Sequence, residues 1–466
     1  MGGQAVLGEV LDRFVERRAV TVMVRAMMQH ALNRHAVDGL FEKTAEEQYT
    51  RELTFSTMVD LMSSVVCGGR PNVHAAYQER VEEIPAKVQA VYEKLAGIEP
   101  GVCASLVRET SKRLGTVIEA TKGALPALLP GRRLRILDGN HQPASERRLK
   151  ELRGSQAGPL PGFCLAVLDP SLMQAIEIIP CEDGHAQERS LTDAILALVE
   201  AGDVWVDDRN FCTVPLLFGV ADRDAFFITR HHAGLQGWRG VDRSRKLGRT
   251  DTGVAYEQEV LVWNGDPTGR VLHVRRITVV LDKPTRDGET EIHILTNLPE
   301  AEVPGLAIAE LYRGRWSIER MFQELEADLC TELRTLGYPR AALFGFTVGV
   351  VAYNVLSAVK AALRGAHGHE RIERDFSTYY VALELRANYE GLCIAVPEET
   401  WLPYEAMSAA AFAKVLLDWA AHVHLRCFQR HPRGPKKPVT PRTRYRHHTH
   451  VSTARLLRAS RGRVTP

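Results

Sequence analysis

Three acidic side chains could act on phosphate esters if the fold brings them together. Asp138 ends the apolar run RILD, Asp208 ends VWVDD, and Glu319 lies within the amphipathic segment LYRGRWSIERMFQEL. Side chains at the end of a strand project from the edge of a sheet rather than into its core. Three gathered carboxylates repel each other by about 4 kcal/mol per pair at ~4 Å and an effective dielectric of ~20, so they need cations between them. Two magnesium ions would suit this set, because each binds a few carboxylates, waters and phosphate oxygens, and a pair can activate an attacking oxygen and stabilise a leaving one.

Each acid also has an ordinary structural interpretation when it is taken alone. An Asp-Gly pair after a strand, as at Asp138, is common turn chemistry. Glu319 could form a surface ion pair with Arg315 one helical turn away. The combination favours a catalytic role, since two strand-end aspartates and one helix glutamate follow each other in this order along the chain.

Two adjacent aspartates compete for the second position. Side chains alternate between the two faces of a strand, so Asp207 shares a face with Trp205, whereas Asp208 shares the other face with Val206. Only one of the two aspartates can therefore lie beside Asp138.

The elements that must position these acids predict an α/β protein with an RNase H-like catalytic core. In such a core, three strands form a meander and later strands alternate with helices. Short apolar or β-branched runs predict the strands, and apolar periodicity predicts the helices between them. Strands are predicted over 133–138, 163–168, 175–180, 204–208 and 226–229, with helices over 188–200 and from 211 onward.

The rest of the chain divides by its residue patterns around this core. Alternating apolar and polar residues with Asn-Gly and Asp-Gly turns predict a β-rich insertion. A helix is predicted from Pro304 to about Leu329, followed by an apolar helix from Ala341 to Val359, which polar interruptions favour as a core helix over a membrane span. The expected domains are a helical DNA-binding domain at 1–125, the core at 126–365 with its insertion at 231–297, a helical region at 366–430, and a basic, Pro-rich arm at 431–466.

A helix pair in the N-terminal domain is a candidate DNA reader. Asn72 can cap one helix reaching Glu82, and Pro85 can open a second helix reaching Leu95. Two helices joined by a tight turn would form a helix-turn-helix, although most such pairs are packing units. On the second helix, the side chains available for DNA are Lys87, Gln89, Tyr92 and Lys94.

Composition limits the possible classes of protein. The formal net charge is only +2, so affinity for nucleic acid must come from local clusters of basic residues. Eight cysteines without metal-ligand spacing, and acids within the first segment, predict reduced thiols and a cytoplasmic location rather than secretion.

Three motifs together resemble a known family. They are L-D-G-N at Asp138, D-R-N-F from Asp208, and Y-R-G-R-W-S-I-E-R-M-F from Tyr312. Over roughly residues 40 to 360 the chain resembles DDE transposases of the insertion sequence four family, the group that includes the transposon-five transposase. The last run matches the family motif Tyr-x2-Arg-x3-Glu-x6-Lys at its first three positions, but Glu326 stands at the lysine position.

The resemblance implies roles for residues of the core. It makes Asp138, Asp208 and Glu319 the ligands of two Mg²⁺ ions, for which Mn²⁺ can substitute. It favours Asp208 over Asp207 because an arginine, Arg209, follows it directly, and we expect that arginine among the DNA contacts.

The resemblance also implies DNA contacts outside the metal ligands. Tyr312 and Arg315 would bind phosphates near the cleaved end, and Trp316 would lie beside the distorted strand. Trp238 or Trp263 of the insertion could stack on a flipped base, although a core role fits each tryptophan equally well.

The expected function is a transposase that binds the ends of its element, cleaves them and joins the 3′ ends to target DNA. Its partners would be terminal inverted repeats, target DNA and a second subunit. The apolar face of a helix at 409–424 would be the dimer contact, with packing inside one chain as the alternative for that face. The alternatives are an RNase H-like nuclease without strand transfer and a catalytically decayed DNA-binding inhibitor of transposition.

Overall fold

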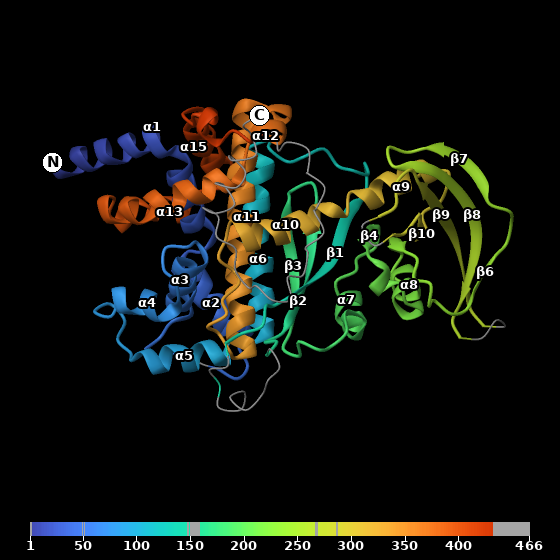
Figure 1. The fold of residues 1–466 in the computed structure, drawn as a ribbon. Helices are drawn as coiled ribbons and strands as arrows, with labels where there is room; N and C mark the ends of the chain where they lie inside the picture. The colour runs from blue at the N-terminus through green and yellow to red at the C-terminus, as the bar shows by residue number, and fades with distance from the viewer. Residues whose placement is uncertain are drawn as a thin grey trace, which may run out of the picture. The chain divides into compact units, whose positions relative to one another are not determined.

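The fold is built on one large mixed β-sheet. The computed structural model describes residues 2–48, 50, 52–146, 149, 159–265, 269–285 and 288–431, with the backbone alone for residues 2–7. Residues 1–429 form one compact unit. Within it, a ten-stranded sheet has the order β3-β2-β1-β4-β5-β10-β9-β8-β6, and β7 pairs with β8 (Figure 1).

The first five strands have the topology that the sequence predicts for an RNase H-like core. Strands β1, β2 and β3 form an antiparallel meander, β4 runs parallel to β1, and β5 runs parallel to β4. Ile136 of β1 pairs with Val206 of β4. Asp138 follows Ile136 by two residues, and Asp208 follows Val206 by two residues. These strands are β1 (Arg133–His141), β2 (Phe163–Asp169), β3 (Gln174–Cys181), β4 (Asp203–Asp207) and β5 (Phe226–Arg230).

Helices cover both faces of this core sheet. Ile136 and Val206 face a layer that includes α6 (Pro100–Ala120) and α11 (Pro339–His367). Leu137 and Trp205 face the opposite layer, which includes α7 (Thr192–Leu196) and α8 (Val214–Ala221). The predicted helix over 188–200 is shorter than expected and consists of the 3-10 turn η2 (Glu188–Leu191) followed by α7. The helix predicted from 211 onward is α8, which begins at Val214 after the 3-10 turn η3 (Arg209–Phe211).

The predicted β-rich insertion consists of strands that lengthen the same sheet. Strand β10 pairs antiparallel with β5, and β8 and β9 form a long hairpin next to it. The core sheet therefore continues into the insertion without a break. Its strands are β6 (Trp238–Gly240), β7 (Arg245–Arg249), β8 (Gly253–Trp263), β9 (Val271–Leu281) and β10 (Glu291–Thr296).

The N-terminal region is helical, as predicted. Asn72 caps its helix by accepting from the Ala75 N–H at 2.9 Å, but that helix ends at Glu79 rather than Glu82. The next helix begins at Val88 rather than near Pro85. The helices are α1 (Gly2–Ala31), α2 (Arg34–Thr44), α3 (Phe55–Val66), α4 (Val73–Glu79) and α5 (Val88–Gly97).

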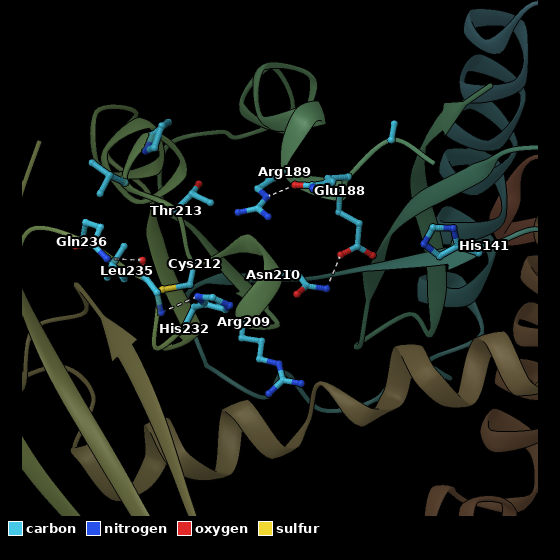
Figure 2. Close-up of a pocket in the computed structure, with 15 residues that line it drawn as sticks. His141, Glu188, Arg189, Arg209, Asn210, Cys212, Thr213, His232, Leu235 and Gln236 are labelled. Carbon is cyan, nitrogen blue, oxygen red and sulfur yellow. Dashed lines mark hydrogen bonds between the residues drawn. The ribbon is translucent and has the colours of Figure 1, made fainter. Parts of the chain in front are cut away.

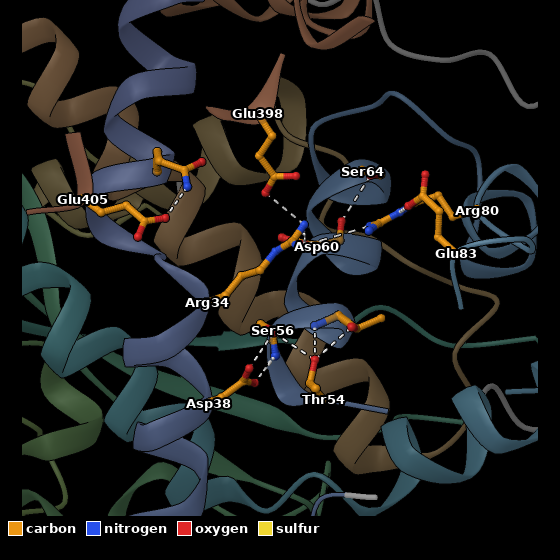
Figure 3. A network of polar contacts seen from close by, with 12 residues as sticks. Arg34, Asp38, Thr54, Ser56, Asp60, Ser64, Arg80, Glu83, Glu398 and Glu405 are labelled. Atoms are coloured by element: carbon orange, nitrogen blue, oxygen red, sulfur yellow. Dashed lines mark hydrogen bonds and ion pairs between the residues drawn. The ribbon is translucent and has the colours of Figure 1, made fainter. Parts of the chain in front are cut away.

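Ion pairs tie these N-terminal helices to the C-terminal region (Figure 3). Arg34 of α2 lies 3.1 Å from Glu398 and 3.7 Å from Asp60 of α3. Asp38 of α2 also accepts hydrogen bonds from the backbone N–H and the hydroxyl of Ser56. The helical regions at the two ends of this unit thus meet at an exposed ion pair, which adds little free energy to their apolar packing.

The C-terminal helices pack back onto the same unit. They are α12 (His369–Asp375), α13 (Thr378–Ala395), α14 (Leu402–Glu405) and α15 (Ala409–Ala421), with the 3-10 turns η4 (Glu398–Thr400) and η5 (Leu425–Phe428). The apolar side chains of α15, such as Phe412 and Leu416, are buried in a core that also contains residues of α1 and α11. The expectation that this face is a free dimer contact is therefore wrong, because the chain itself covers it.

Helix α11 is the long apolar helix that the sequence predicts inside the core. Its length and composition would suit a membrane span, but its apolar window is entirely buried within the structure. The basic arm, apart from His431, lies outside the described residues.

Candidate active site

The three predicted acids lie near one edge of the core sheet, where two of them bind the same arginine. The Nη1 atom of Arg315 lies 2.7 Å from Oδ2 of Asp138, and its Nη2 lies 2.5 Å from Oε1 of Glu319. The hydroxyl of Tyr312 donates to Oδ1 of Asp208 at 3.5 Å. The acid side chains are 18%, 28% and 25% exposed for Asp138, Glu319 and Asp208, so solvent and substrate can reach all three.

Local structure explains how the helix contributes. The predicted helix from 304 to 329 is two helices, α9 (Gly305–Arg313) and α10 (Trp316–Ala327), separated at Gly314 and Arg315. Arg315 precedes α10, and Glu319 lies in the first turn of that helix. The pair is not the exposed ion pair of a surface helix, because the Arg315 side chain is only 8% exposed and also binds Asp138.

The adjacent aspartates differ as the alternation predicts. Asp207 is fully buried on the face of Trp205, and its Oδ1 atom has no hydrogen-bond partner among the described residues. Burial raises the pKa of Asp207 well above its usual range, which favours the neutral acid. Asp208, on the other face, is the aspartate that the structure places beside Tyr312 and Arg230.

Burial and charge act in opposite directions on Asp138. Burial raises the pKa of Asp138 to about 6, against the lowering effects of Arg315 and the Gly139 N–H; Glu188 and Asp208 raise it further. Burial opposes the charged form of Arg315, yet its pKa is raised by Tyr312 and the surrounding carboxylates. The guanidinium thus acts as the cation that offsets their mutual repulsion.

The donor atoms suit a hard divalent cation, but Arg315 lies between two of them. Carboxylate oxygens are the ligands that magnesium and manganese prefer. Among the described residues, no group of three acidic, histidine or cysteine side chains is placed so as to hold a metal ion. The oxygens of Asp138, Asp208 and Glu319 thus have the chemistry that the expected metal prefers, but in this structure the Arg315 guanidinium occupies two of the three carboxylates.

Other predicted DNA contacts near this edge differ in their exposure. Trp316 is 57% exposed, one of the most exposed large apolar side chains of the described chain, and the Arg315 guanidinium lies 5.9 Å from its ring. Arg209 is half-exposed and lies 3.1 Å from Glu289. Both side chains are open to a ligand, whereas Tyr312 is buried.

The remaining predicted DNA contacts are Trp238 and two lysines of the N-terminal helices. Trp238 makes an edge contact with His231 at 4.9 Å, and the Arg276 guanidinium lies 5.2 Å from its ring. The exposed Lys87 precedes α5, but the Lys94 ammonium lies 4.3 Å from the ring centre of Phe41. Trp238 thus packs between His231 and Arg276, and the Lys94 ammonium is directed toward the helical core.

Two residues near the acids escaped the sequence reasoning. Arg230 lies 3.9 Å from Asp208 and forms a 2.5 Å ion pair with Glu289. It ends β5, the parallel neighbour of β4, so its strand-end position was a usable signal. Glu188 accepts from the Asn210 amide at 3.1 Å, and a Cβ at Gly139 would lie only 2.1 Å from its Oε1.

Glu326, which stands at the motif's lysine position, lies near the end of β1. It is exposed, and with Asn140, His141 and Gln142 it lines a small cavity of about 100 Å³. Glu326 therefore lies near the segment that directly follows Asp138, as its spacing from Glu319 predicts.

Comparison with known proteins agrees with this geometry. Residues 130–355, the segment that carries all three acids, match the family model described as the transposase DDE domain. This segment, just under half of the chain, is therefore similar to transposase DDE domains. The more specific similarity to the insertion sequence four group stays a prediction.

Two individual proteins are similar to the chain. One is y4zB of Sinorhizobium fredii (strain NBRC 101917 / NGR234), provisionally assigned as a transposase, with 31% identity over 134 residues, 28% of this chain. The chain spans about a third (35%) of the length of that relative. The other is a piggyBac transposase, solved as a synaptic complex with hairpin DNA, with 10% identity, coverage of 86% of this chain and 70% of that chain, and a TM-score of 0.32. This score is too low to equate the two folds.

Proposed function

We propose that the chain is a DNA transposase that binds the ends of its element, cleaves them and joins the 3′ ends to target DNA. The observation that carries the proposal is that Asp138 and Glu319 both bind Arg315, whose charge also interacts with Asp208, within a segment that matches the transposase DDE domain. A decayed, purely DNA-binding protein would have no need to keep three mutually repelling carboxylates half-buried at one point.

In this proposal, each residue of the site has a definite task. Asp138, Asp208 and Glu319 hold two Mg²⁺ ions, which when bound supply activation of the attacking oxygen and charge stabilisation of the leaving oxygen. Tyr312 holds Asp208 in position through its hydroxyl. Arg315 exchanges its carboxylate partners for a DNA phosphate, since a guanidinium can bind either group through paired hydrogen bonds.

DNA would reach this site along the α9–α10 side. The exposed Trp316 ring next to Arg315 offers a stacking surface beside a phosphate ligand. The half-exposed Arg209, which directly follows Asp208 in the chain, adds a second cation. We further propose that two subunits bridge two DNA ends in the cytoplasm, through a surface other than the buried face of α15.

The test combines pure full-length protein with duplexes that carry the terminal repeats flanking its gene, a supercoiled target plasmid and Mg²⁺. We expect cut ends and joined plasmid products. Cut products alone would indicate a nuclease of the same fold, and a bound complex without cutting would indicate an inhibitor. Either result would overturn the proposed function, as would cleavage that persists in Glu319→Gln.

A further inference from the structure

A second cavity lies against the strands that carry the two catalytic aspartates. This cleft, of about 730 Å³, runs between η2 on one side and the start of α8 with the 232–236 loop on the other (Figure 2). Arg209 and Asn210, which directly follow Asp208, line it, and so does His141 at the end of β1. Elements of the α7–α8 layer form its walls, whereas Glu319 belongs to a helix of the opposite layer.

Hydrogen-bond donors dominate the polar lining of this cleft. Arg189 is exposed and has no carboxylate partner among the described residues; its Nε donates to Gln187 at 2.5 Å. His232 accepts the Gly234 N–H on Nδ1 at 2.9 Å, so its neutral ring carries the proton on Nε2 and can donate it. Glu188 is the one acid among the described lining residues, and the Asn210 amide already binds it.

We propose that this cleft binds the phosphodiester backbone of the target DNA strand. The proposal rests on the proposed function, because strand transfer requires a 3′ end and a target phosphate at the same carboxylates. The α9–α10 side, with Trp316 and Arg315, is taken by the element end. The cleft approaches the aspartates from the other layer and presents donors, which are the groups that bind phosphate oxygens without regard to base sequence.

Its shape and charge suit a DNA strand better than a small metabolite. The cleft is an open, mixed polar and apolar trough, in which Leu235 and Pro215 lie beside the charged Arg189 and Arg209. Apolar walls can lie along sugars and bases while the arginines bind phosphates. Binding of this kind tolerates any sequence and weakens as salt rises, because phosphate neutralisation releases counterions.

The test measures target binding separately from end binding. Full-length protein is saturated with unlabelled end duplex, and a labelled 30-base-pair duplex without the end sequence is titrated in by fluorescence anisotropy at several salt concentrations, with Ca²⁺ in place of Mg²⁺. We expect Arg189→Gln to weaken this second binding event roughly tenfold, as for a lost charged hydrogen bond. The slope against log salt should fall by about one, and Arg189→Glu should weaken binding further.

The matched control is Arg223→Gln, an exposed arginine after α8 that does not line the cleft. It removes the same charge and should leave target binding unchanged. In Mg²⁺, Arg189→Gln should lower joining of precleaved ends at limiting plasmid, while its cleavage of intact ends stays at the level of the control.

Two results would overturn the assignment of the cleft. One is unchanged affinity and salt slope for the end-free duplex in both Arg189 variants. The other is a loss of end binding and end cleavage as large as the loss of target binding, which would place the element end in the cleft. If the wild-type protein neither cuts nor joins, the proposed function fails, and the binding measurement on end-free duplex still decides the role of the cleft.

Discussion

The carboxylate edge of the sheet and the α4–α5 helix pair are both candidate DNA-contacting regions, yet the structure treats them differently. At the edge, Arg315 links Asp138 and Glu319 across 177 and 4 residues of chain separation. In the helix pair, Lys94 lies over Phe41, within the N-terminal helices. Half-buried like charges gathered from distant segments cost free energy, whereas a lysine covering an aromatic ring stabilises the fold. The first arrangement calls for a function, and the second is explained by packing.

The strongest test of a catalytic role for the carboxylate edge is a comparison of the two adjacent aspartates. Asp208→Asn should reduce cleavage by about a thousandfold or more, because it removes charge where catalysis depends on electrostatic stabilisation, while end binding stays near wild type. Asp207→Asn is the matched control: burial already favours the neutral acid there, so cleavage should change little. Gel assays of cleavage and of end binding measure both effects. If Asp207→Asn loses activity and Asp208→Asn keeps it, the catalytic residue is Asp207 and our assignment of Asp208 is wrong.

Acid pH should expose the free-energy cost of gathering the acids. Burial raises the pKa of Asp138 to about 6, above its value of about 4 in an unfolded chain. Between these pH values the folded state binds more protons than the unfolded state, so the free energy of unfolding falls as pH rises through this window. For metal-free protein the contribution is on the order of 3 kcal/mol.

Denaturant unfolding at pH 4, 5, 6 and 7 in EDTA measures this effect. Asp138→Asn should be less dependent on pH than the wild type over the same window, since it lacks the titrating group. Identical pH profiles for the two proteins would show that Asp138 is not held in a costly ionised state. Metal binding should weaken below about pH 6 in the wild type, because protons then compete with the cation for Asp138.

Removing the central cation should sharpen the comparison further. Arg315→Gln should bind Mn²⁺ more tightly in the absence of DNA, by roughly tenfold, because the positive charge that opposes the metal is gone. Isothermal titration calorimetry measures this affinity, and end cleavage should fall in the same variant, since its phosphate ligand is lost. Arg313→Gln, at an exposed arginine paired with Asp251, is the control and should leave Mn²⁺ binding unchanged. Weaker Mn²⁺ binding in Arg315→Gln would mean that Arg315 organises the ligands rather than occupying their place.

The sequence predicted what depends on local periodicity and chain order. Alternation in β4 separated Asp207 from Asp208, and the order of strands and helices predicted the edge where Asp138 and Asp208 lie together. It did not predict contacts made between distant segments. Arg230 gains its role only because β5 aligns with β4, and the cleft beside Glu188 exists only once η2 faces the 232–236 loop.

The same limit explains the two expectations that failed in the helical parts. The sequence suggests that the apolar face of α15 is a free surface, but residues of α1 and α11, which both precede it in the chain, cover it. One helix from 304 to 329 fits the apolar periodicity, yet the chain breaks it at Gly314, just before the arginine that binds two acids. Periodicity shows which face of a helix or strand is apolar, but it does not show which other segment packs against that face.

The smallest expected effects concern the helix pair, and they separate its two lysines. Lys87→Ala should weaken end binding a few-fold and reduce the salt slope by about one, as for one lost phosphate contact, with no change in the free energy of unfolding. Lys94→Ala should instead lower the free energy of unfolding by about 1 kcal/mol, because it removes the ammonium and its aliphatic stem from Phe41. Its effect on the salt slope should be negligible. Anisotropy against end DNA and urea unfolding of both variants measure the two quantities, and a reversed pattern would mean that Lys94, despite its packing, is the residue that reads DNA.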